Sequence, residues 1–171
     1  ESGKTFLIEE FLEGEEFSAF AIVSGQDFRI LGYAQDHKRL HNKDLGPNTG
    51  GMGCSAPPKV VTKKVQKQAI KIIEKTIQGL SKLKISYIGV LYLGAIVDKS
   101  ESVKIIEYNA RWGDPEAQVI VPSIKNDFYK LSDLASTKKL NAVKIIRDTN
   151  YWLTVTVASK GYPENYKKLI G

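Results

Sequence analysis

Three polar side chains recur at two-residue spacing within the run IEYNARWGDPEAQ, residues 106–118. In an extended strand alternate residues share a face, so Glu107, Asn109 and Arg111 would lie on one side, roughly 6.6 Å apart. Carboxylate and amide oxygens are the hard ligands that Mg²⁺ prefers, and an arginine can bind a carboxylate or phosphate through two parallel hydrogen bonds. The pattern predicts a metal-bound nucleotide beside an anionic substrate. The simpler alternative is a strand end with polar residues facing water, followed by a Gly-Asp-Pro turn.

A second candidate is the glycine-rich run GPNTGGMG, Gly46 to Gly53. Glycine tolerates positive φ, so consecutive backbone amides there could converge on an anion. The run is not a Walker loop, because no Gly-Lys-Ser/Thr follows it. A mobile surface loop is the alternative. The nearby His37 and His41 lack a third partner for a metal, and Cys54 has no evident base to make it a nucleophile.

The third candidate is LIEEFLEGEEF, Leu7 to Phe17. A strand that leads into a short connection can offer backbone N–H and C=O groups to an adenine edge. An acid seven residues later, the spacing of Glu9 and Glu16, could then bind ribose hydroxyls. Acidic residues at a strand end and turn are also ordinary, so this signal is weak by itself.

Composition narrows the class of protein. The 171 residues are 42% hydrophobic and 26% charged, which is typical of a globular domain. The single cysteine cannot form an internal disulfide, which suits the reducing cytoplasm. No apolar run approaches the roughly 20 residues of a membrane span, and we expect no membrane partner. The net charge of +6 falls mainly on lysines of one expected helix, while residues 1–16 are acidic; this distribution argues against nucleic-acid binding.

Periodicity and turn residues predict an α+β chain. Successive strands follow each other closely, which favours antiparallel pairing. Thr62 is a plausible N-cap for a long helix whose apolar residues recur at helical spacing. The expected strands are 5–11 (buried), 17–24, 28–35, 87–97, 103–109 and 152–158; the expected helices are 62–84, 116–121 and 127–136; residues 36–58 are expected to form one long loop.

Several of these segments together resemble the ATP-grasp ligases and, within them, the phosphoribosylamine–glycine ligase (glycinamide ribonucleotide synthetase) family. The segments are IEEFLEGEE (8–16), AQDHKR (34–39), GPNTGGMG (46–53), RWGDPEAQ (111–118) and ASKGYP (158–163). They occur in the family's order across nearly the whole chain. The family has Phe or Leu where this chain has Trp112, a conservative departure. The resemblance implies the second ATP-grasp subdomain, an antiparallel sheet with packed helices, over residues 1–140. A linker over 141–151 and the start of a C-terminal domain over 152–171 would follow.

The resemblance also implies a reaction and a set of site residues. ATP would activate glycine as an acyl phosphate, which the amine of 5-phosphoribosylamine would attack to give glycinamide ribonucleotide, in purine biosynthesis. Glu107 and Asn109 would bind Mg²⁺ or Mn²⁺, and Arg111 with Lys38 would be catalytic. The nucleotide would be bound by Glu9, Glu10, Leu12 and Glu16, and the substrates by Asp36, His37, Arg39, Asn48, Thr49, Gly50 and Gly51.

The family's first ATP-grasp subdomain, with its lysines and glycine-rich flap, has no counterpart before Glu1. We therefore expect a piece of a longer enzyme with little or no ligase activity alone. Two alternatives remain open: another ATP-grasp carboxylate–amine ligase, and a non-catalytic nucleotide-binding module. Retention of Glu107, Asn109 and Arg111 favours an enzyme, and GPNTGGMG favours the glycine ligase over other members of the class.

Overall fold

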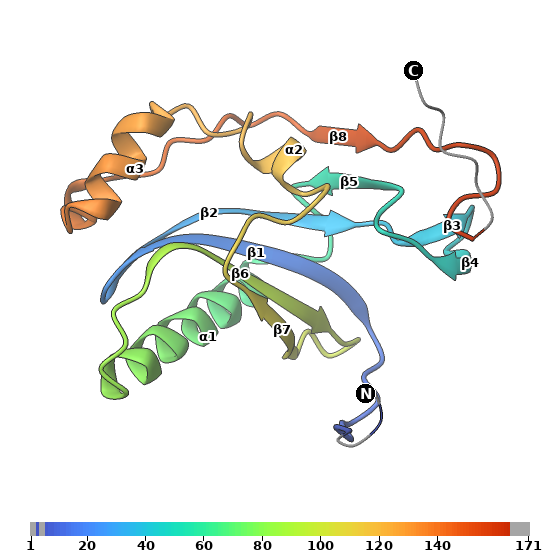
Figure 1. Cartoon of the computed structure of the whole chain (residues 1–171), viewed down its shortest axis with the longest axis horizontal. Coiled ribbons are helices and arrows are strands. Elements are labelled where there is room, and N and C mark those ends of the chain that lie inside the picture. The colour runs from blue at the N-terminus through green and yellow to red at the C-terminus, as the bar shows by residue number, and fades with distance from the viewer. Residues whose placement is uncertain (1–2, 4–5, 165–171) are drawn as a thin grey trace.

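The computed structural model describes residue 3 and residues 6–164, and its centre is a six-stranded antiparallel sheet (Figure 1). The order across the sheet is β7-β6-β1-β2-β5-β8, and β3 and β4 form a separate two-stranded hairpin. The strands are β1 Glu15–Ser24, β2 Asp27–Asp36, β3 Arg39–His41, β4 Leu45–Asn48, β5 Gly53–Ala56, β6 Ile88–Val97, β7 Val103–Asn109 and β8 Trp152–Val155. The helices are α1 Lys63–Lys82, α2 Ala117–Ile120 and α3 Phe128–Ser136, with a 3₁₀ turn η1 at Leu140–Ala142.

Strand β1 is the centre of the fold because it is buried on both faces from residue 17 to residue 24. It pairs with β2 on one side and β6 on the other. Its odd-numbered residues, such as Ala19, pack in the cluster with α1, and its even-numbered ones, such as Phe20, pack in the cluster with α2 and α3. A strand covered on both faces reads as a continuous apolar run, which explains the sequence FSAFAIVS.

Helix α1 covers one face of the sheet (Figure 1). As predicted, it begins after Thr62, whose hydroxyl accepts a hydrogen bond from the Val65 amide. Its buried residues recur every four positions, one turn apart, and therefore form a single stripe: Val65, Ala69, Ile73 and Ile77. The stripe fixes the helix against the sheet and leaves its lysines in solvent.

The short helices α2 and α3 lie on the opposite face (Figure 1). Asp127 caps α3 by accepting a hydrogen bond from the Lys130 amide. Val119 and Ile120 of α2 and Leu131 of α3 are buried against this face. The expected strands from residue 17 onward and all three expected helices are therefore present, with ends shifted by a few residues.

Two expectations are wrong. Residues 6–12 form no strand, and Phe6, Leu7 and Ile8 are each about 80% exposed; Thr5 lies outside the described residues. Both edges of β1 are already paired. The strand β7 ends the sheet, but residues 6–12 do not join it as a strand, and Glu10 contacts it through the ion pair with Lys104. Residues 36–58 are not one loop either, since they contain β3, β4 and β5.

The C-terminal segment packs against the same sheet. Val143 and Ile145 pack on the cluster beneath α2 and α3, Arg147 bridges to Ile124, and β8 pairs with β5. The division at residues 141–151 into an ATP-grasp portion and the start of another domain stays a prediction.

Candidate functional site

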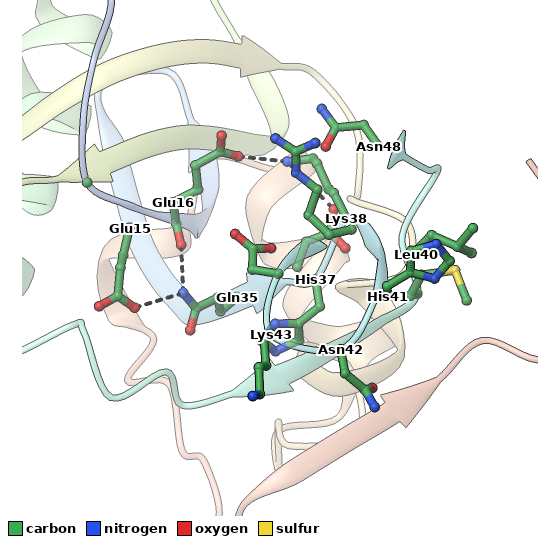
Figure 2. Close-up of a pocket in the computed structure, with 15 residues that line it drawn as sticks. Glu15, Glu16, Gln35, His37, Lys38, Leu40, His41, Asn42, Lys43 and Asn48 are labelled. Carbon is green, nitrogen blue, oxygen red and sulfur yellow. Dashed lines mark hydrogen bonds and ion pairs between the residues drawn. The ribbon is translucent and has the colours of Figure 1, made fainter. Parts of the chain in front are cut away.

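A cleft of about 730 Å³ opens where β1 and β2 meet the β3–β4 hairpin. Figure 2 shows its lining side chains, which come from the start of β1, the end of β2 and both hairpin strands. The predicted residues that line it are Glu16, Asp36, His37, Lys38, Arg39 and Asn48. The structure thus brings one predicted nucleotide residue together with predicted substrate residues and one catalytic residue.

Lys38 is the central cation of this cleft. Its Nζ lies 2.9 Å from Glu16 Oε2, the contact drawn in Figure 2, and 3.7 Å from Asp36 Oδ2. Burial favours the neutral amine, but the hydrogen bond and charge of Glu16, with the charge of Asp36, outweigh it and raise the pKa of Lys38. The ammonium therefore stays charged at neutral pH, as a group that attracts phosphate or carboxylate must.

Asp36 is the most constrained acid of the cleft. Its side chain is only 8% exposed, and its Oδ1 has no hydrogen-bond partner among the described residues. Burial raises its pKa to about 6; Glu116 and Glu16 add to the rise and Lys38 opposes it. A carboxylate that titrates close to neutrality is typical of a functional site.

The glycine-rich run packs directly on Asp36. Gly51 has φ +118°, and a Cβ there would lie 2.6 Å from Pro115 Cδ and 2.9 Å from Asp36 Oδ1. Only glycine fits this conformation and this space. The Thr49 hydroxyl donates to the Lys38 carbonyl oxygen at 2.8 Å and accepts from the Gly51 amide at 3.0 Å. The predicted loop residues are therefore held by the cleft and by each other.

The segment after β8 supports the same loop from outside. The Gly50 amide donates to the Tyr162 hydroxyl at 3.0 Å, and the Thr156 hydroxyl donates to the Gly51 carbonyl at 2.8 Å. The Thr156 amide donates to the Met52 carbonyl at 3.0 Å. Residues about one hundred positions away in sequence thus fix the loop.

The two predicted metal ligands, Glu107 and Asn109, lie on one face of a strand, as the sequence spacing predicts. Glu107 and Asn109 end β7, and Asn109 Nδ2 donates to Glu107 Oε1 at 3.0 Å. Arg111 lies just beyond the strand and donates through Nη1 to the Trp112 carbonyl at 2.9 Å. A narrow crevice of about 30 Å³ is lined by Glu107 together with Glu16, Asp36 and Lys38, which places the end of β7 next to the main cleft.

The donor set suits a hard cation. Glu107 supplies carboxylate oxygens, and rotation of the Asn109 amide would present its oxygen beside them. Within residues 3 and 6–164, no three His, Cys, Asp or Glu side chains converge as a ready metal site. A bound Mg²⁺ or Mn²⁺ would therefore need further ligands from nucleotide, water or other protein groups.

Three predicted nucleotide residues lie apart from the main cleft. Glu10 pairs with Lys104 at 2.6 Å, and both line a separate cleft of about 300 Å³ with Leu12. Glu9, the residue before Glu10, is exposed on the same irregular segment. Glu16 lines the main cleft instead, so the structure does not group all four residues.

Sequence reasoning missed a buried polar cluster beneath the cleft, formed by Ser18, Tyr92 and Glu116. Ser18 Oγ lies 2.9 Å from Glu116 Oε1 and 3.0 Å from the Tyr92 hydroxyl. A serine inside the apolar strand FSAFAIVS was the available signal, since a buried hydroxyl needs a partner. The motif RWGDPEAQ contains Glu116 but carries no local signal that this side chain is buried.

This architecture is that of the ATP-grasp class. A solved structure similar to it is that of phosphoribosylamine–glycine ligase from Thermotoga maritima, with a TM-score of 0.80 and 35% identity; the match covers 93% of this chain and 40% of that one. The chain belongs to the phosphoribosylglycinamide synthetase family: the sequence model of that family's ATP-grasp (A) domain matches residues 1–117.

Curated relatives carry the same family name. The chain is 45% identical over 170 residues to phosphoribosylamine–glycine ligase of Streptococcus pneumoniae serotype 4, covering 98% of this chain and 40% of the relative. It is 43% identical over 169 residues to phosphoribosylamine–glycine ligase of Vigna unguiculata, covering 98% of this chain and 54% of the relative. It thus spans about half or less of each relative's length. The part of the chain that the structure describes contains no helix long and apolar enough to cross a membrane.

Proposed function

We propose that the chain forms part of an enzyme that joins glycine to 5-phosphoribosylamine at the expense of ATP. A glycine carboxylate oxygen attacks the γ-phosphorus and ADP leaves, which gives glycyl phosphate. The amine nitrogen of phosphoribosylamine then attacks the acyl carbon, phosphate leaves, and the nitrogen loses a proton, giving glycinamide ribonucleotide. The observation that carries this proposal is the convergence of Asp36–Arg39 and Asn48 at one cleft, with Gly51 and Pro115 packed behind Asp36.

The residues of the chain contribute position and charge to this chemistry. Lys38 presents a charged ammonium to the cleft and would stabilise the transferring phosphoryl group. Arg111, whose fork can bind two oxygens at once, would hold the glycine carboxylate or that phosphoryl group. Glu107 and Asn109 would hold Mg²⁺ or Mn²⁺, which supplies neutralisation of phosphate charge when bound.

The remaining residues would bind the two ligands. ATP-grasp enzymes use ATP with a divalent metal, and Glu9, the backbone at Glu10 and Leu12, and Glu16 would together hold its adenine and ribose. Asp36, His37 and Arg39 with Asn48, Thr49, Gly50 and Gly51 would bind the substrates; six of these seven lie in or directly against the cleft, and Gly50 lies within the same loop. A lone buried thiol, Cys54, fits the reducing cytoplasm where we place the protein.

The test uses a chimera, because the chain spans about 40% of the Streptococcus pneumoniae relative. Residues 1–171 replace the matching segment of that ligase, and ADP release is measured with glycine and phosphoribosylamine. Glu107→Gln should lower kcat at least about 100-fold with little change in unfolding, because the exposed carboxylate is not part of the core. Glu74→Gln, the same change on the exposed face of α1, is the control and should behave like the parent.

Wild-type turnover by the Glu107→Gln chimera would remove the metal assignment. A parent chimera that binds ATP without turnover would favour a non-catalytic nucleotide module. The isolated 171-residue chain should show little or no ADP release, and substantial substrate-dependent release would contradict the expectation that it is one part of a larger site.

A further inference from the structure

Glu116 is the one charged residue among the described residues that is almost completely buried, with 3% of its surface exposed. No Lys, Arg or His side chain within the described part of the chain pairs with it. Burying an unpaired carboxylate costs free energy that an apolar residue would not cost. Packing alone therefore does not explain a glutamate at this position.

The contacts of Glu116 connect elements of the cleft. Its Oε1 lies 2.9 Å from Ser18 Oγ, on β1, and Ser18 Oγ lies 3.0 Å from the Tyr92 hydroxyl, on β6. The carboxylate also fills the space that a side chain at Gly113 would need. The turn that follows β7 is thereby fixed to β1 and, through Ser18, to its neighbour β6.

The Gly113–Glu116 turn also fixes the floor of the cleft. Pro115, adjacent to Glu116, packs on Gly51, and Gly51 packs on Asp36 Oδ1; an added Cβ at Gly51 would lie within 3 Å of both neighbours. Asp36 then lies 3.7 Å from Lys38. A continuous series of contacts thus leads from Glu116 to the ammonium that faces the cleft, and none of them requires Glu116 to touch a ligand.

Charge provides a second connection. The titratable groups that face Asp36 are Lys38, Glu116, Glu16 and Cys54. After burial, Glu116 is the leading cause that raises the pKa of the Cys54 thiol to about 12, and it also raises the pKa of Asp36. The Glu116 charge therefore reaches β2, which lines the cleft through Asp36, and its neighbour β5, which carries Cys54.

We propose that Glu116 is a positioning residue: Ser18 anchors its carboxylate, and Glu116 fixes Asp36 and Lys38 at the floor of the cleft through Pro115 and Gly51 and through its own charge. The inference rests on the proposed ligase function for its catalytic consequence. Its structural part can be tested without turnover.

The first experiment follows the Asp36 side-chain carboxyl by ¹³C NMR in the 171-residue chain. Glu116→Gln keeps an acceptor for Ser18 and removes the charge, so the pKa of Asp36 should move down from about 6 toward its ordinary value. Glu116→Asp keeps the charge and should leave the pKa raised. Glu74→Gln, a distant loss of one charge, should leave the titration unchanged. An unchanged Asp36 titration in Glu116→Gln would overturn the proposal.

The second experiment measures kinetics in the chimera. Glu116→Gln should lower kcat roughly 10- to 100-fold while KM for ATP changes less than about twofold, because displacing cleft groups slows transfer without removing a nucleotide contact. The acid limb of the pH profile of kcat should move to lower pH in Glu116→Gln, because the pKa of Asp36 falls. Glu116→Asp should return this limb to its position in the parent chimera. Equal kcat and pH profiles in Glu116→Gln and Glu74→Gln would overturn the proposal.

Ser18→Ala keeps the Glu116 charge and removes the contact, so it tests positioning if the Gln variant fails to fold. It should lower kcat and leave the Asp36 titration near its parent value; a folded Ser18→Ala chimera with parent kcat would overturn the contact series. An inactive parent chimera would overturn the proposed ligase function, while the NMR titration would still decide the role of Glu116.

Discussion

The two faces of the sheet are built from the same strands but differ in what they bury: one face buries an apolar core, and the other also buries polar groups next to the cleft. The face beneath α1 is closed by an apolar cluster that runs from Phe17 and Ala19 on β1 to Ile73 on the helix. The opposite face carries an apolar cluster as well, but it also buries Ser18, Tyr92 and Glu116 and opens into the cleft. Because alternate residues of a strand point to opposite faces, one strand can supply a core and a polar site together. Neighbouring residues of β1 therefore serve different roles: Phe17 and Ala19 belong to the apolar core, and Ser18 between them belongs to the polar cluster.

The largest effect on stability should come from the closed face. Ile73→Ala removes a fully buried side chain and should lower the free energy of unfolding by about 2–5 kcal/mol. Ile70→Ala is the matched control on the same helix, because Ile70 is 38% exposed, and it should cost less than about 1 kcal/mol. Urea unfolding of both variants measures the difference. Equal losses would mean that the α1 stripe does not carry the core.

The second prediction concerns the buried acid of the open face. The folded pKa of Asp36, about 6, lies above its ordinary value of 3.8, so the folded chain binds this proton more tightly than the unfolded chain. Stability from this group is present below pH 4 and is lost as pH rises to about 6. Asp36→Asn should therefore be more stable than the parent at pH 8, by no more than about 3 kcal/mol. That advantage should shrink as pH falls toward 4.

Asp98 is the contrasting control for this pH dependence. Hydrogen bonds from Ser100 and Ser102 lower the pKa of its carboxyl. Its ionised form is favoured by folding, so Asp98→Asn should lose stability at neutral pH and approach the parent at low pH. Unfolding midpoints measured from pH 2 to 8 should give opposite trends: the Asp36 effect appears between about pH 4 and 6 and the Asp98 effect below about pH 4. Parallel trends would contradict the burial of Asp36 as the cause.

The third prediction addresses the loop over Asp36. Gly51→Ala would force a Cβ against Pro115 and Asp36 at a positive φ, and should cost about 1–3 kcal/mol. Gly79→Ala lies in α1 with nothing within 4 Å and should be neutral or stabilising by up to about 1 kcal/mol. Thermal unfolding of the pair separates local strain from the general effect of the added methyl. A neutral Gly51→Ala would show that the loop can move off the acid.

The smallest effect should come from the outer support of that loop. Thr156→Val removes the hydroxyl that donates to the Gly51 carbonyl and should cost about 0.5–1.5 kcal/mol. Amide exchange at Gly51 and Met52 should become faster. Thr154, two residues before Thr156, donates a hydrogen bond to Gln118 instead of to the loop. Thr154→Val should therefore leave the exchange rates of the Gly51 and Met52 amides unchanged. Faster exchange in both variants would indicate a general loosening of β8.

Local signals predicted much of this chain. Thr62 capped its helix as expected because an N-cap needs only its own next turn, and the turns after Ser24 and Val97 followed from short polar sequences between apolar runs. The expected strand at residues 5–11 is wrong because an apolar run does not by itself specify a pairing partner. Both edges of β1 are occupied by β2 and β6, and the described residues 6–11 do not pair with the terminal strands β7 and β8.

The candidate site likewise has features that local sequence predicts and features that depend on contacts between distant segments. The strand face of Glu107 and Asn109 could be predicted from spacing, because a period of two is a property of any extended chain. The contact of Gly51 with Asp36 and Pro115 could not, since it joins three segments far apart in sequence. The role of Thr156 and Tyr162 as loop supports is likewise a product of strand pairing at β5 and β8.

The sequence by itself determined the three helices and the strands β1, β2, β6, β7 and β8, the strand face of the metal candidates and, through its motifs, the family, because these depend on residue type and short-range spacing. Only the tertiary structure decided that Asp36 is a buried acid with a pKa of about 6, that Lys38 pairs with both Glu16 and Asp36, and that Glu116 is buried without a cation partner among residues 6–164. Burial and charge coupling arise when distant segments are packed together and water is excluded, and no local pattern encodes them.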